Sequence, residues 1–158
     1  MSDAEDTLIL TLDAGPVTIR LRSDLAPGHV ERIKELAREG FYDGVVFHRV
    51  IDGFMAQGGD PTGTGSGGSD KPDLKAEFSK EPHVRGVVST ARMGHDINSG
   101  NSQFFICLDD ATFLDGDYTV WGEVIEGMDA VDALPKGEPP RNPGKIVSMK
   151  VAADAGAA

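Results

Sequence analysis

Three short segments of the 158-residue sequence place polar side chains beside large apolar ones. In an extended strand, alternate residues lie on the same face. The sets that share a face are Phe47, Arg49 and Ile51 in "VFHRVI", Met55 and Gln57 in "FMAQ", and Gln103 and Phe105 in "SQFFICL". A guanidinium and two amides among aromatic and methionine side chains are typical of a pocket for a small ligand or a peptide.

Other readings of the same residues compete with a pocket. An isolated arginine on a strand is more often a solvated edge charge, and His48 is more often structural than a base or metal ligand. No histidine pair has the spacing H-x-x-x-H or H-x-H that would favour a metal site. A Ser-His-Asp set can be assembled from Ser102 and His48, but no G-x-S-x-G supports it. Strand patterning alone therefore leaves the pocket a hypothesis.

A glycine-rich stretch, "GTGSGG", contains a literal G-x-G-x-x-G at Gly63, Gly65 and Gly68. A dinucleotide site needs a helix that opens at these glycines, so that its N-terminus faces the phosphates. Here Pro72 and Asp73 interrupt any such helix. We interpret the glycines as bends in an ordered loop, with a nucleotide-binding protein as the weaker alternative.

Composition and charge exclude several classes of partner. The formal net charge is −11, which repels phosphate backbones and anionic membrane surfaces, so neither nucleic acid nor membrane is expected as a partner. Cys107 is the only cysteine, and its apolar neighbours favour a buried, inert thiol. The acidic N-terminus has no basic region followed by a long apolar run, so a cytoplasmic protein without a signal peptide is expected.

Hydrophobic periodicity predicts a mainly β protein. Strands are expected at 7–12, 17–22, 46–51, 54–57, 86–91, 102–109, 118–125 and 145–151, and helices at 26–40 and 128–135. Residues 58–86 and 136–144 lack periodicity and are expected to be irregular. The connections are short and show no strand–helix–strand rhythm, which favours a closed eight-stranded antiparallel β-barrel capped by two α-helices. We expect one domain over 1–158, with a frayed tail over 153–158.

The sequence resembles the cyclophilins, a family of peptidyl-prolyl cis-trans isomerases, over nearly its whole length. The segments "FHRVIDGFMAQGGD", "NSQFFICLDDATFLDG" and "WGEVIEGMDAVD" are similar to its signature blocks, and "ARMGHD" is closer to single-domain bacterial members. The resemblance implies an eight-stranded barrel, prolyl isomerisation that assists protein folding, and no cofactor or metal. The implied partners are proline-containing peptides and unfolded or folding proteins.

The resemblance also implies roles for individual residues. Arg49 matches the catalytic arginine. The implied substrate-binding residues are Phe54, Met55, Phe105 and Leu114 around the proline ring, Phe113 at the rim, Gln57 and Gln103 near the substrate backbone, Ala91 and Arg92 pairing with the residue before proline, Gly65 beside the adjacent subsite, and Tyr118.

Three positions depart from many eukaryotic members. Phe113 replaces a tryptophan that hydrogen-bonds cyclosporin, Tyr118 replaces a histidine, and Arg92 replaces an asparagine. Weakened cyclosporin affinity is therefore expected. A module that binds proline segments without turnover is the main alternative function, and a monomer is the default state.

Overall fold

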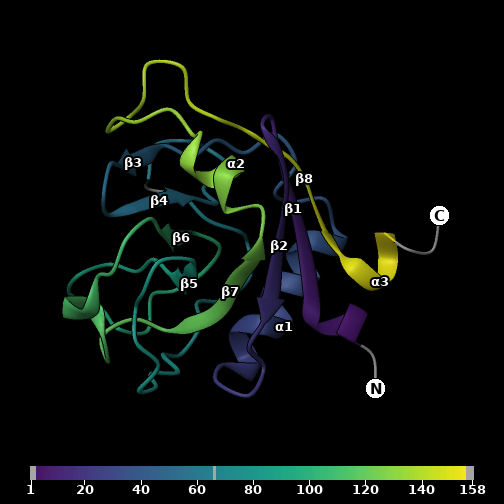
Figure 1. Cartoon of the computed structure of the whole chain (residues 1–158). Coiled ribbons are helices and arrows are strands. Elements are labelled where there is room, and N and C mark those ends of the chain that lie inside the picture. The colour runs from purple at the N-terminus through teal and green to yellow at the C-terminus, as the bar shows by residue number, and fades with distance from the viewer. Residues whose placement is uncertain (1–2, 66, 156–158) are drawn as a thin grey trace.

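The computed structural model describes residues 3–65 and 67–155, which form one eight-stranded antiparallel sheet. The strand order is β3–β4–β6–β5–β7–β2–β1–β8. The strands are β1 (Thr7–Leu12), β2 (Gly15–Leu21), β3 (Arg49–Ile51), β4 (Met55–Gly58), β5 (Val87–Thr90), β6 (Phe104–Cys107), β7 (Val120–Glu126) and β8 (Ile146–Val151). The helices are α1 (Pro27–Arg38), α2 (Met128–Asp132) and α3 (Ala152–Ala155), with 3₁₀ turns η1 (Asp3–Asp6) and η2 (Thr112–Leu114). Figure 1 shows the sheet curled, with α1 and α2 toward opposite ends.

The first hairpin confirms the predicted alternation. Leu8 lies opposite Ile19 and Leu10 opposite Val17 in the β1–β2 ladder, and all four side chains are fully buried. Their inward face joins the main hydrophobic core of the sheet. Burial of such aliphatic side chains contributes about 1.5–3 kcal/mol each.

The prediction of a closed barrel is wrong, because the sheet is an open, curled half-barrel. Its edge strands are β3 and β8, and no ladder joins them. Isolated bridges join Val46 to Lys145, in the segments that precede these strands, and Val50 of β3 to Gly137 in the segment that precedes β8. The chain that leads into β8 contains Pro139, Pro140 and Pro143. Gly137 of this segment exchanges backbone hydrogen bonds with Val50 of β3, both at 2.8 Å. The prolines that follow have no N–H to donate, so this pairing is not continued as a ladder.

Helix α1 lies where its periodicity predicts, and its apolar face packs against β7 and β8. Val30, Ile33 and Leu36 are buried. Its N-terminus has no local acceptor, because the N-cap residue is Ala26. The Glu77 carboxylate supplies the cap from the irregular segment that follows β4, accepting hydrogen bonds from the backbone N–H groups of Gly28 (3.1 Å) and His29 (2.9 Å).

The neighbouring strands β4, β6 and β5 bury side chains on both faces of the sheet. A second, smaller apolar cluster covers the face opposite the main core, and its buried members are Met55, Val87, Phe105, Cys107 and Val120. Alternation along a strand sends Phe104 into the main core and Phe105 into this second cluster. The candidate site is built on this outer cluster.

The alternation predicted for residues 46–51 does not hold at the N-terminal end of this segment. Phe47 was expected to share a face with Arg49 and Ile51, but it is fully buried in the main core, where its ring centroid lies 6.1 Å from that of Phe104. Strand β3 begins only at Arg49, so the two-residue period does not extend back to Phe47. The turn at Asp52–Gly53, by contrast, is where it was predicted, with Gly53 at φ 74°.

The C-terminal segment ends in a short helix. Residues 152–155 form α3, which packs against β1 and η1, and Asp154 forms an ion pair with Arg38 at 2.9 Å. Residues 156–158 of the predicted tail lie outside the described residues. Among the described residues, no helix is both long and apolar enough to span a membrane.

Candidate active site

A pocket of about 140 Å³ opens on the outer face of β3, β4 and β6. It is lined by Arg49, Phe54, Met55, Gln57, Ala91, Arg92, Phe105, Leu114 and Tyr118. All nine were predicted as site residues from the sequence. The pocket is small enough for a single ring, and its lining combines large apolar side chains with two arginines, a glutamine and a tyrosine.

Strand register brings the central residues together. Arg49 on β3 lies opposite Gln57 on β4, which in turn lies opposite Phe105 on β6. Paired residues on neighbouring strands point to the same face, so one guanidinium, one amide and one aromatic ring form a row across the sheet. The Tyr118 ring closes the far side, edge-on to Phe105 with centroids 5.6 Å apart.

Arg49 combines an anchored end with free donors. Its Nε donates to Oε1 of Glu138 at 3.1 Å, and the two side chains are 43% and 56% exposed. Its two terminal nitrogens make no hydrogen bond to any described residue. The guanidinium can therefore donate to an electron-rich atom held in the pocket. Sequence analysis missed Glu138, which is 89 residues away and carries no motif.

A second, larger cavity of about 500 Å³ adjoins the pocket and shares Gln57, Ala91 and Arg92 with it. Two more predicted residues, Gly65 and Gln103, lie here rather than in the pocket. The Gln103 amide donates to the carbonyls of Gly65 and Gly67, both at 2.9 Å, and accepts from the Gln57 amide at 3.1 Å. The two predicted glutamines therefore form one hydrogen-bonded wall between the cavities.

Asp60 organises the glycine-rich loop from within, and sequence analysis did not single it out. Its carboxylate is fully buried and accepts hydrogen bonds from Thr62, Thr64 and Gly65. Burial acts to raise the pKa of this carboxyl, but the backbone and hydroxyl donors outweigh it and hold the pKa well below its usual range. The N–H groups that a phosphate would need already donate to a carboxylate, which argues against the nucleotide-binding alternative.

Two residues predicted to contact the substrate backbone have some of their groups occupied. The Ala91 N–H donates to the Gln103 carbonyl at 3.0 Å, so only the Ala91 carbonyl and the Arg92 N–H are available. The Arg92 guanidinium donates to the backbone carbonyls of Asp117 and Met93 and lies 4.7 Å from the centroid of Tyr118. Its guanidinium donors are therefore taken up by backbone carbonyls.

The structure places Phe113 outside the pocket lining. Its side chain is 71% exposed, and its ring centroid lies 5.6 Å from that of Phe54. Phe54 does line the pocket, so Phe113 stands beside one wall and remains open to solvent.

His48 lines neither of the two cavities. It is buried, and burial lowers the pKa of its imidazole, which favours the neutral ring. Across residues 3–65 and 67–155, no group of three or more His, Cys, Asp or Glu side chains could hold a metal ion. The chemistry available in the pocket is thus steric fit around a ring and hydrogen bonding from a fixed cation.

Comparisons with known proteins agree with this geometry. The family model for "Cyclophilin type peptidyl-prolyl cis-trans isomerase/CLD" matches residues 7–151. A "Probable peptidyl-prolyl cis-trans isomerase" of Brucella suis is 53% identical, over 97% of this chain and 86% of that protein. The crystal structure of cyclophilin AquaCyp293 from Hirschia baltica has a TM-score of 0.89 at 33% identity, covering 96% of this chain and 76% of the other. A Cryptosporidium parvum cyclophilin solved in the presence of the dipeptide Ala-Pro has a TM-score of 0.85 at 27% identity, covering 92% and 98%.

Proposed function

This chain belongs to the cyclophilin-type peptidyl-prolyl cis-trans isomerases, and from that premise we propose that Arg49 stabilises the twisted X-Pro amide in its pocket. One observation supports the proposal above the others. The terminal nitrogens of Arg49 are unpaired among the described residues at the edge of an apolar pocket. The other arginine of the lining, Arg92, has its guanidinium bonded to backbone carbonyls.

The reaction needs no bond to be made or broken. Rotation about an X-Pro bond breaks amide resonance, against a barrier of about 20 kcal/mol. In the twisted state the proline nitrogen regains a lone pair, which a guanidinium N–H can bind. Such a contact is stronger in the transition state than in either planar isomer, so it accelerates the reaction in both directions. Arginine keeps its charge at any working pH, which suits this role.

Arg49 alone is too small a contribution for an efficient enzyme. A rate gain of roughly 10⁵ needs about 7 kcal/mol. One charge-assisted hydrogen bond contributes about 1.5–3 kcal/mol, and a preorganised donor in a drier site about 3–4 kcal/mol. We infer that the rest comes from holding the proline ring among Phe54, Met55, Phe105 and Leu114 while the preceding carbonyl swings. The Ala91 carbonyl and Arg92 N–H would hold the preceding residue.

The test compares Arg49→Ala with wild type in two measurements. Isomerisation of an Ala-Pro-Phe peptide is followed by NMR exchange, and peptide binding by titration. We expect kcat/KM to fall at least about 100-fold, as for loss of one preorganised donor, while binding weakens less than tenfold. Arg141→Ala, which removes an exposed arginine that lines neither cavity, is the matched control and should behave as wild type. Equal losses of turnover and binding would refute the role of Arg49.

The proposal extends to the setting in which the enzyme acts. Its clients would be folding chains with exposed X-Pro bonds, met by a cytoplasmic monomer. Cyclosporin would bind weakly, because Phe113 offers no N–H at the rim and is largely exposed. A proline-binding module without turnover remains distinguishable, since it would bind the Ala-Pro-Phe peptide without accelerating its isomerisation.

A further inference from the structure

The wall of the second cavity carries one carboxylate, Asp73, from the segment Ser69–Asp73 that leads away from the glycine-rich loop. We propose, on the basis of the proposed function, that Asp73 is a specificity-determining residue. It would select substrates with a cationic side chain two residues before the proline.

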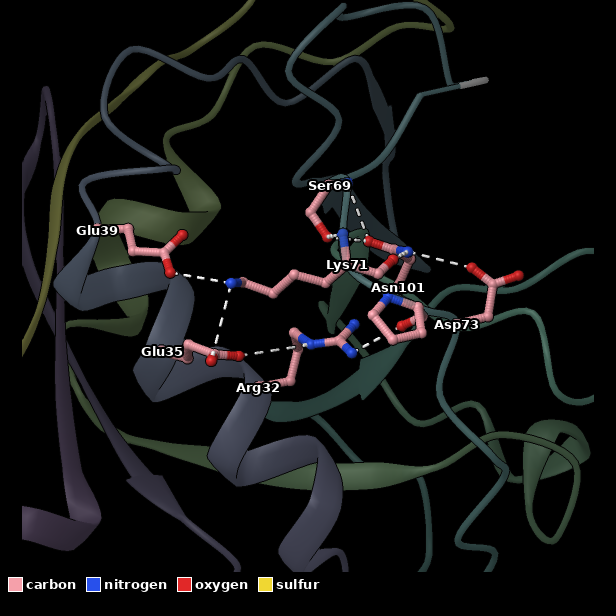
Figure 2. Close-up of polar contacts among 8 residues, drawn as sticks. Arg32, Glu35, Glu39, Ser69, Lys71, Asp73 and Asn101 are labelled. Atoms are coloured by element: carbon pink, nitrogen blue, oxygen red, sulfur yellow. Dashed lines mark hydrogen bonds and ion pairs between the residues drawn. The ribbon is translucent and has the colours of Figure 1, made fainter.

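Asn101 holds this carboxylate in place. Its amide Nδ2 donates to Oδ1 of Asp73 at 3.1 Å and to the Lys71 carbonyl at 2.9 Å. Its Oδ1 accepts from the backbone N–H of Ser69 at 2.9 Å and from the Ser69 hydroxyl at 2.5 Å. Figure 2 shows these contacts converging on Asn101, which itself lines the cavity. The segment is therefore fixed along its length, and Asp73 Oδ2 accepts no hydrogen bond from any described residue.

Two cations that Figure 2 shows near Asp73, Lys71 and Arg32, are engaged elsewhere. The Lys71 ammonium reaches α1, where it lies 2.9 Å from Glu39 and 3.7 Å from Glu35. Arg32 donates from α1 to the Pro72 carbonyl at 2.6 Å. No cation of the described residues forms an ion pair with Asp73. The Asp73 carboxylate therefore has the Asn101 amide as its hydrogen-bond donor and no cationic partner among the described residues.

The one cation of the cavity lining does not compensate Asp73. The guanidinium of Arg92 is bonded to the carbonyls of Asp117 and Met93 and stacks on Tyr118. The cavity therefore presents an uncompensated negative charge, within a protein of net charge −11 whose field attracts cations.

The position of the cavity indicates which substrate residue it would meet. It continues from the proline pocket past Ala91 and Arg92, the two residues expected to pair with the residue before proline. A peptide held there directs the next side chain toward the N-terminus into the larger cavity. At about 500 Å³, that cavity has room for a lysine or arginine side chain.

The experiment measures kcat/KM for three acetylated peptides, Xaa-Ala-Pro-Phe with Xaa as lysine, norleucine or glutamate. Norleucine has the lysine stem without its charge. We expect wild type to prefer lysine over norleucine by about fivefold at low salt, the size of one partly exposed ion pair, and to disfavour glutamate. The preference should shrink in 0.5 M NaCl, because salt screens exposed charges.

Two variants separate a local effect from the general field. Asp73→Asn should bring the lysine-to-norleucine ratio to about one, whereas Asp70→Asn, an exposed carboxylate of the same segment outside the cavity lining, should keep the wild-type ratio. A wild-type ratio near one on a rapidly isomerised norleucine peptide would overturn the specificity and leave the isomerase standing. An equal loss of preference in both variants would also overturn it. Absence of turnover on every peptide would instead refute the proposed function.

Discussion

Replacing Asp60 by asparagine should destabilise the protein strongly at neutral pH and less strongly in acid. The carboxylate is fully buried, with Oδ2 accepting from the N–H groups of Thr64 (3.1 Å) and Gly65 (2.6 Å), and Oδ1 from that of Thr62 (2.8 Å). Asparagine keeps one acceptor oxygen and turns an NH₂ group toward donors. Asp60→Asn therefore loses about two hydrogen bonds to a charged group, at about 1.5–3 kcal/mol each.

The loss should be at least about 3 kcal/mol at pH 7, or roughly 6–12 °C in Tm for a chain of this length. The pH dependence follows from the direction of the pKa shift. The pKa of Asp60 in the folded state lies well below its usual range, whereas an unfolded aspartate titrates near about 3.9. The stabilisation is thus complete above about pH 4–5 and is lost as the pH falls toward the folded pKa. Between pH 7 and pH 3 the wild-type advantage should shrink by about 1.3 kcal/mol.

Urea unfolding of both proteins at pH 7, 5, 4 and 3 measures this difference directly, because groups common to both cancel. Asp70→Asn is the control, since Asp70 is exposed and close in sequence, and it should change stability by less than about 0.5 kcal/mol. A loss below about 1 kcal/mol at pH 7 would refute the account of the buried carboxylate. So would a difference between wild type and Asp60→Asn that stays constant from pH 7 to pH 3.

Two further predictions concern packing. In Gly59→Ala the new Cβ would clash with the backbone carbonyl oxygen of Ser102, at a φ of +99°, so urea unfolding should show a loss of stability above about 3 kcal/mol. Gly53→Ala, at φ +74° with no atom within 4 Å, should cost only about 1–2 kcal/mol, and similar losses in both would contradict the clash. Burial raises the pKa of the Cys107 thiol to about 12, so a disulfide reagent at pH 8 should label it only at the rate of unfolding. Rapid labelling of the native protein would contradict this.

The part of the site that is built from local sequence patterns can be predicted from the sequence. Period-two alternation and the family's motif together indicate the face that holds Arg49, Gln57 and Phe105, because these residues lie on adjacent ladders of one sheet. The contacts between segments that are distant in the sequence cannot be predicted in this way. The ion pair of Arg49 with Glu138 and the hydrogen bond from the Asn101 amide to Asp73 follow no spacing rule. Each joins segments that only the folded chain brings together.

The fold shows the same division. Strand positions follow from hydrophobic periodicity, but closure of the barrel depends on whether β3 and β8 can exchange hydrogen bonds. Gly137 pairs with Val50 of β3, but the prolines between Gly137 and β8 remove the N–H donors that would continue this pairing as a ladder. Periodicity reports which face a residue prefers and contains no information on which strand edges meet.

The cap that Glu77 places on α1 has a consequence for the order in which structure can form. A helix of this length with no acceptor at its own N-terminus is marginal by itself. Its first N–H groups are satisfied only when a carboxylate 48 residues later arrives from the irregular segment after β4. Helix and segment therefore constitute one cooperative unit. Amide protons in the first turn of α1 should exchange with solvent at the opening rate of that distant segment, rather than at the fraying rate of an autonomous helix end.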